Sequence, residues 1–229
     1  MKSLRLRVPP SIVLALTVFT TSAASASVIP IGVGAFGPGF TLTTFTGLAD
    51  NTQVNGLIVN GILFQYSLPN TLPFGPVIID GGPGVTNNIT PPNIVSIGDN
   101  TGVLTLTFPW VIDAFGYGYA ILALMPVTNA TTIALFADAT PVGSLSYNGA
   151  PDPLFTGGFA GIQSTLPFNI AQITFNSSAA SAFALDNVRT GTIGTVIPEP
   201  ATVLLVGAGI VAAARRRGPR IVRPPERRD

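Results

Sequence analysis

The most constraining feature of the chain is an alternation of side chains with a period of two residues. In 102–108, Leu104, Leu106 and Phe108 share one face, while valine and threonine occupy the other. In 115–121, aromatic residues and isoleucine alternate with glycine and alanine. A period of two places successive side chains on opposite faces of a β-strand. Further strand-like runs are 40–46, 57–66, 130–136, 144–147, 169–175 and 182–189.

Turn-forming residues separate these runs. Glycine, proline, asparagine and aspartate concentrate at 69–70, 80–84, 91–93, 99–102 and 148–149, and small residues fill 177–181. Such clusters between strand-like runs favour tight connections. Many short strands separated by turns predict an all-β fold, a single jelly-roll-like β-sandwich over residues 27–192. The chain has no cysteine, so this body must be stabilised by burial rather than by disulfides.

The N-terminus has the three parts of a secretory signal peptide. Lys2, Arg5 and Arg7 form a basic start, and residues 12–19 form a short apolar core. Ala24 and Ala26 supply the small-x-small pattern that signal peptidase recognises. We therefore expect residues 1–26 to be removed during export.

The C-terminus carries a second apolar segment. Residues 201–214 contain no charge and end at Arg215, Arg216 and Arg217. A helix of this length spans about 21 Å, which is short for a bilayer core of about 30 Å. Flanking apolar residues and an arginine that reaches the headgroups make up the difference. The segment is predicted to be a transmembrane helix with the arginines as its stop.

The charges divide the chain into the same three parts. Residues 1–26 carry three basic groups and no acid, whereas residues 27–197 carry seven aspartates and one basic residue, Arg189. Residues 198–229 carry seven arginines against three acids. Because basic flanks stay cytoplasmic, the acidic body is expected on the other side of the membrane. A single arginine in the body excludes binding to a nucleic-acid backbone.

The order of motif, apolar run and basic stop resembles the PEP-CTERM protein-sorting domain. The resemblance covers residues 196–217 and centres on Pro198, Glu199 and Pro200. It implies export across the inner membrane of a Gram-negative bacterium that makes exopolysaccharide, and a transient membrane anchor. It also implies cleavage at or near these three residues by an exosortase, a membrane-embedded cysteine transpeptidase-like enzyme. We expect domain boundaries at 193–217 for the sorting signal and 218–229 for a disordered basic tail.

A second resemblance lies within the body. Segments 155–157, 167–168, 173–175 and 183–188 are similar to the closing part of bacterial jelly-roll modules related to lectin and carbohydrate-binding domains. In some of those modules the acidic residue of the last strand binds a structural Ca²⁺. The resemblance thus makes Asp186 and Asn187 candidate calcium ligands. The alternative is that they form a hydrogen-bonding pair at the end of a strand.

The residue inventory argues against catalysis. The chain has no histidine or cysteine, and residues 27–197 have no lysine or glutamate. Ser-His, Cys-His and Ser-Lys machinery and the usual zinc sites are therefore excluded. No other cofactor is indicated. A glycosidase-like or protease-like pair of aspartates remains as the alternative. It would have to come from Asp50, Asp80, Asp99, Asp113, Asp138, Asp152 and Asp186.

Two function classes follow from these patterns. The first is a non-catalytic protein of the cell surface or biofilm matrix, with exosortase, signal peptidase and exopolysaccharide as partners. In it, Trp110, Tyr117 and Tyr119 are either a stacking platform for sugars or residues that pack in the core or at the edge of the fold. The second is a secreted hydrolase that uses two aspartates. The absence of histidine, cysteine, lysine and glutamate from residues 27–197 favours the first class.

Overall fold

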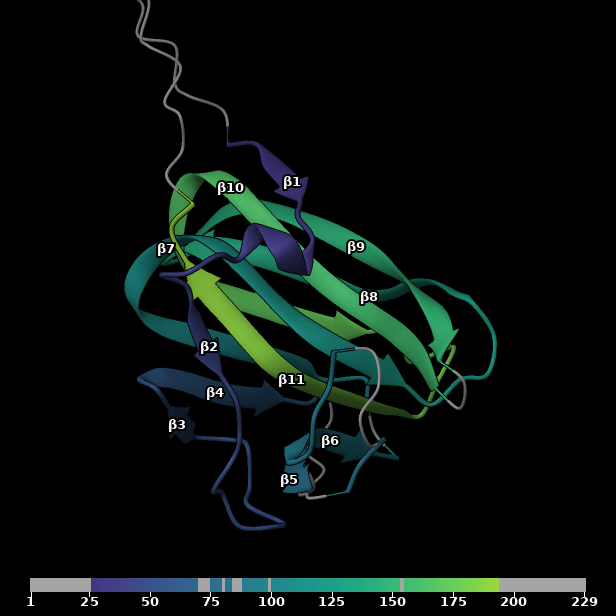
Figure 1. Cartoon of the computed structure of the whole chain (residues 1–229). Helices are drawn as coiled ribbons and strands as arrows, with labels where there is room; N and C mark the ends of the chain where they lie inside the picture. The colour runs from purple at the N-terminus through teal and green to yellow at the C-terminus, as the bar shows by residue number, and fades with distance from the viewer. Residues whose placement is uncertain are drawn as a thin grey trace, which may run out of the picture.

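The computed structural model describes residues 26–69, 75–79, 81–83, 88–98, 100–152 and 155–193. These residues form an elongated β-sandwich in which every strand pairing is antiparallel (Figure 1). A 3-10 turn, η1 at Val33–Ala35, is the one helical element among them. The prediction of a single all-β sandwich is therefore confirmed. The strands are β1 (Val28–Pro30), β2 (Thr41–Thr43), β3 (Leu57–Val59), β4 (Ile62–Ser67), β5 (Val77–Ile79), β6 (Asn93–Ile97), β7 (Val103–Ile121), β8 (Val127–Ala137), β9 (Thr140–Asp152), β10 (Phe155–Phe175) and β11 (Ala182–Gly191).

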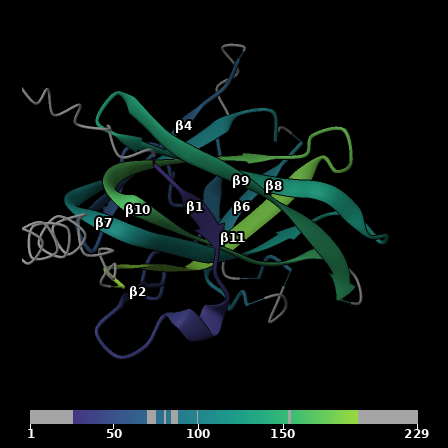
Figure 2. The same ribbon diagram turned by 90° about the horizontal axis from the view of Figure 1, so that it is seen from above.

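Two long strands, β7 and β10, run through both layers of the sandwich. The first part of β7 pairs with β4 and with the end of β10, and β8 and β9 continue this layer. The second part of β7 pairs with β11 and with the start of β10, and β11 continues to β6 and β5. The short β1 lies along β10 (Figure 2). One hydrogen-bonded network thereby connects the two layers.

The passage between the layers is a bend in β7. The ladder between β7 and β10 jumps from Ile112↔Phe168 to Thr107↔Ile170. Residues 108–111 consequently have no partner on β10, as expected of a bulge that turns a strand. Pro109 fits there because proline has no N–H to donate to a ladder. We call residues 109–111 the bend tip.

The core lies between the layers and is rich in aromatic residues. Phe115, Tyr117 and Tyr119 come from the second part of β7 and are buried, as are Leu104 and Leu106 from the first part. The residues that the alternation placed on one face thus share an inward face in the structure. The opposite face of the second part is also buried, because glycine and alanine there let neighbouring segments pack directly on the strand.

Several details of the strand prediction differ from the structure. Residues 57–66 form a hairpin rather than one strand, with Asn60 and Gly61 at positive φ in its turn. The runs 102–108 and 115–121 belong to one strand, β7. Asn148-Gly149, predicted as a turn, lies within β9, and Asn93, predicted in a turn, begins β6. Strands β1, β5 and β6 were not predicted.

The predicted membrane segment cannot be compared with this structure. Among the described residues, no helix has the length and apolar character needed to cross a bilayer. The predicted helix 201–214 and its arginine stop lie outside the described residues, as does the basic tail. Both therefore stay predictions.

Candidate functional site

A buried polar pocket lies on the outer face of the layer formed by β6, β11 and β7. Asp186 of β11 pairs with Gly118 of β7 and has no exposed surface. The register between β11 and β6 ends at Leu185↔Ile94, so Asn93 is the next residue opposite Asp186. Asn93 is also fully buried. Strand pairing thus places two buried polar side chains that are far apart in the sequence on the same face of the layer.

Neither polar side chain has its full set of partners. Oδ2 of Asp186 accepts a hydrogen bond from the backbone N–H of Thr90 at 3.0 Å. Its other oxygen, Oδ1, has no partner, and neither Oδ1 nor Nδ2 of Asn93 has one. Burial raises the pKa of Asp186 to about 6, although the N–H groups of Asn187 and Thr90 and the charge of Arg189 oppose this shift. The pocket therefore favours a protonated carboxyl group more than water does.

The structure separates the roles of the two predicted calcium ligands. The Nδ2 of Asn187 donates to the carbonyl oxygen of Asn88 at 2.7 Å, and Asn187 has a positive φ. Asn187 thus braces the segment that covers Asp186. The side chain aligned with Asp186 across the strands is Asn93, which sequence reasoning missed because only the register of β6 reveals it.

The donors in this pocket fit Ca²⁺ poorly. Among the described residues, three buried side-chain oxygens have no hydrogen-bond partner: Oδ1 of Asp186, Oδ1 of Asn93 and Oγ1 of Thr190. Only Asp186 carries a charge. Ca²⁺ takes about six to eight oxygen ligands. In the described part of the chain, no three or more histidine, cysteine, aspartate or glutamate side chains form a metal-binding group. The sequence resemblance predicts calcium binding at Asp186 and Asn187, whereas this set of donors does not favour it.

An arginine and aromatic residues flank the polar pocket. The guanidinium carbon of Arg189 lies 5.8 Å from the centroid of the Phe159 ring, and Phe36 packs against the same ring edge to face. Glycine makes room for this ring, since a Cβ at Gly116 or Gly161 would lie 2.6 Å from it. The one basic residue of the body is therefore held in a cation–π contact. Its Nη1 also donates to the carbonyl oxygen of Asn187.

An apolar groove of about 330 Å³ lies on the other side of the pocket. It is lined by Ile79, Gly82, Pro83, Val95, Ile97, Ala120, Leu122, Phe155, Ala182, Phe183 and Ala184. None of these residues has a polar side chain. Sugars need hydrogen-bonding partners as well as apolar contact, so this groove does not suit a glycan.

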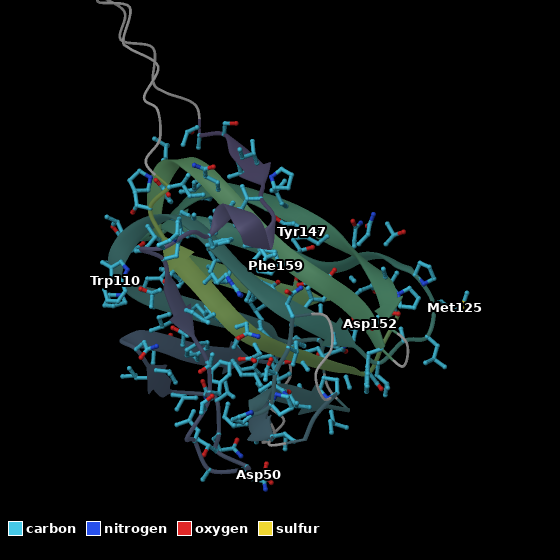
Figure 3. All side chains as sticks on the ribbon, in the orientation of Figure 1. Asp50, Trp110, Met125, Tyr147, Asp152 and Phe159 are labelled. Carbon is cyan, nitrogen blue, oxygen red and sulfur yellow. The ribbon has the colours of Figure 1, made fainter. Side chains whose placement is uncertain are left out.

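The predicted sugar-stacking residues do not form one platform. Tyr117 and Tyr119 are buried, and their hydroxyls pair with Oγ1 of Thr131 at 2.6 Å and the carbonyl oxygen of Asn148 at 2.9 Å. Burial raises the pKa of Tyr119 to about 12. Both tyrosines are core residues, the second of the two predicted readings. Trp110 alone is exposed, at the edge of the body in Figure 3.

A hollow of about 240 Å³ lies beside the bend tip. Val111, Ile112, Asp113, Thr165, Pro167 and Thr192 line it. Oδ1 of Asp113 accepts a hydrogen bond from the N–H of Ile193 at 2.7 Å. The exposed Trp110 directly precedes Val111, which lines this hollow.

The described aspartates do not share a site. Asp50 accepts from Asn51, Asp113 from Ile193 and Asp138 from Asn169. Figure 3 shows Asp50 and Asp152 on separate parts of the body. Asp80 and Asp99 lie outside the described residues. The described geometry thus offers no carboxylate pair for the hydrolase alternative.

The two predicted processing sites flank the body in the sequence. Ala24 and the sorting residues Pro198, Glu199 and Pro200 fall outside the described residues. Ala26 is described and packs partly buried against the core. Ser27 and Thr165 exchange backbone and side-chain hydrogen bonds. Ser27 is therefore already part of the folded body.

Comparison with known proteins identifies the sorting signal. The PEP-CTERM protein-sorting motif matches residues 196–217, the same residues that carry the resemblance in the sequence. That prediction is confirmed. No curated protein sequence matches the chain significantly.

Similar solved structures include family 29 carbohydrate-binding modules. A mutant of one such module is 9% identical, with a TM-score of 0.36, over 70% of this chain and 98% of that chain. Another structure of this family is 10% identical, with a TM-score of 0.34, over 72% of this chain and 96% of that chain. These scores are low, and the fold assignment rests on the strand pairing above.

Proposed function

We propose that the chain is an exported surface protein that an exosortase processes at Pro198-Glu199-Pro200, and that its body is a non-catalytic part of an extracellular matrix. The observation that carries the proposal is the PEP-CTERM motif at 196–217. It begins three residues after Ile193, where the described body ends. The signal peptide predicted at 1–26 supplies the route across the inner membrane of a Gram-negative bacterium, with signal peptidase as the first processing enzyme.

Exopolysaccharide is the partner that we propose for the exported body. Trp110 supplies a half-exposed ring, and Asp113, Thr165 and Thr192 line the hollow beside the bend tip. Aromatic stacking with a few adjacent polar groups is a general mode of contact with sugar rings. Because the surface is small, binding is expected to be weak and to depend on many copies of the protein.

A hydrolase that uses two aspartates is the alternative proposal. It requires a carboxylate pair, and the described aspartates have separate partners. Turnover of a polysaccharide, ester or peptide that is abolished by a single Asp→Asn substitution would make this alternative the better account.

The proposal is tested by fractionating cells with and without exosortase. With the enzyme, the protein should leave the membrane fraction and become accessible to added protease outside the cell. A variant with Ala at 198–200 should stay in the membrane fraction in both strains. Release of this variant to the same extent as the unmodified chain would refute exosortase processing at the motif.

A further inference from the structure

The bend tip is an exposed apolar protrusion. Trp110 and Val111 are 47% and 64% exposed, and Pro109 beside them is also exposed. They protrude because the bulge removes their partners on β10. None of the three carries a charge. An apolar tip with a tryptophan is costly to leave in water and matches the interfacial region of a bilayer, where tryptophan is enriched.

The first and the last residues of the folded body both lie near this tip. Val111 and Thr192 line the same hollow, and the N–H of Ile193 is held by Asp113 two residues beyond Val111. Thr165 lines that hollow as well, and its Oγ1 accepts from the N–H of Ser27 at 3.0 Å. The chain therefore enters and leaves the folded body beside the bend tip.

The connection from the body to the apolar segment spans less than the distance between the bend tip and the far end of β7. Residues 194–200 separate Ile193 from Ala201, and seven extended residues reach roughly 25 Å at most. A second group of exposed apolar residues, Leu122, Leu124 and Met125, follows the C-terminal end of β7. Ten strand residues lie between Val111 and Leu122, which are therefore separated by roughly 35 Å. Figure 3 places Trp110 and Met125 at opposite ends.

We propose that, while residues 201–214 hold the chain in the membrane, the bend tip rests on the bilayer interface with Trp110 and Val111 in contact with lipid. This inference rests on the proposed function, which supplies the anchored intermediate. The short connection keeps the tip near the membrane and keeps the cluster at Met125 away from it. Cleavage at the sorting motif then frees the same end for contact with the matrix.

Trp110 is the one tryptophan of the chain and reports directly on this contact. The protein is exported in a host without exosortase, purified with its C-terminal segment, and reconstituted into phosphatidylcholine vesicles with brominated acyl chains. Brominated lipid should quench the emission of Trp110 at least about twofold. The matched control carries Trp110→Phe and Met125→Trp, which moves the reporter to the far end, and its emission should change little. Circular dichroism verifies that both proteins keep the same fold.

The two assays separate the orientation from the anchoring. Flotation of the vesicles on a density gradient reports whether the chain is anchored, and quenching reports which end faces the lipid. If both proteins float and the control is quenched as strongly as the native chain, the orientation is wrong while the proposed function stands. If neither protein floats, the anchored intermediate is wrong, and the inference falls with it.

Discussion

The N–H of Ile193 donates a hydrogen bond to Oδ1 of Asp113 at 2.7 Å, which ties the end of the described body to the start of the second part of β7. Asp113 is nearly fully buried. Replacing it with alanine removes the charge-assisted acceptor of the Ile193 N–H. We predict that Asp113→Ala lowers the free energy of unfolding by about 1–3 kcal/mol. Asp113→Asn keeps an acceptor oxygen and should lose less. Urea denaturation measures both, and equal losses would show that the bond contributes nothing.

The buried carboxyl group of Asp186 should make stability depend on pH. Its pKa is about 6 in the folded body against an ordinary value of 3.8. The folded state therefore binds more protons than the unfolded state between about pH 4 and pH 6, and the free energy of unfolding falls as the pH rises through this range. Below about pH 4 the penalty is absent, and above about pH 6 it is complete.

The variant Asp186→Asn isolates this dependence. The amide carbonyl can still accept from Thr90, and the buried charge is gone. At pH 7 the variant should be more stable than the native chain, by on the order of 2 kcal/mol, and at pH 4 the two should be equal. Thermal unfolding of both proteins at four pH values gives the comparison. A native chain that is the more stable of the two at pH 7 would contradict the assignment.

Calcium binding at Asp186 would be detected as a change in the melting temperature. Because the described donors are too few for Ca²⁺, we predict that 1 mM Ca²⁺ leaves the melting temperature of the body unchanged. A ligand that binds the folded state alone would raise it. A rise of several degrees that disappears in Asp186→Asn would establish a calcium site in the pocket.

Gly157 should tolerate no side chain. A Cβ there would overlap the carbonyl oxygen of Tyr119 and lie 2.8 Å from Cα of Ala120, both backbone atoms of β7. We predict that Gly157→Ala costs several kcal/mol or prevents folding, since neither strand can move away. Gly34→Ala is the control, because a Cβ at Gly34 meets nothing within 4 Å. Comparable losses in the two variants would contradict the close packing of β10 on β7.

The hydroxyl of Tyr117 contributes to the core through one contact. It lies 2.6 Å from Oγ1 of Thr131, which in turn bonds to the carbonyl oxygen of Thr174. We predict that Tyr117→Phe lowers the free energy of unfolding by about 1–2 kcal/mol. A double-mutant cycle with Thr131→Val should show coupling of similar size. Additive effects would mean that the two hydroxyls do not depend on each other.

The alternation in the sequence predicted the fold class because each strand buries one face. It could not reveal that 102–108 and 115–121 are one strand, since a bulge at 108–111 changes the direction of β7 without ending it. Asn60-Gly61 did carry a hairpin signal. The continuous apolar run around it concealed the turn. Asn148-Gly149 was predicted as a turn but lies within β9. Glycine is needed there for packing, because a Cβ at Gly149 would lie 2.7 Å from Cγ2 of Thr156.

The candidate site was predictable in part. The C-terminal sorting motif depends on local order and charge, so it was found from the sequence alone. The residue opposite Asp186 could not be predicted, because only the register of β6 and β11 places Asn93 across from it. The burial of Tyr117 and Tyr119 likewise depends on which face of β7 turns inward. A period of two identifies two faces and does not say which one is covered.

The measurement that most directly tests the account is the intact mass of the exported protein. In a host with exosortase, the mass should correspond to a chain that starts at Ser27 and ends at or near Pro198-Glu199-Pro200. In the same host, the variant with Ala at 198–200 should keep its C-terminal segment and arginines. An exported native chain that retains residues 201–229 in the presence of the enzyme would contradict the assignment of this protein as an exosortase substrate.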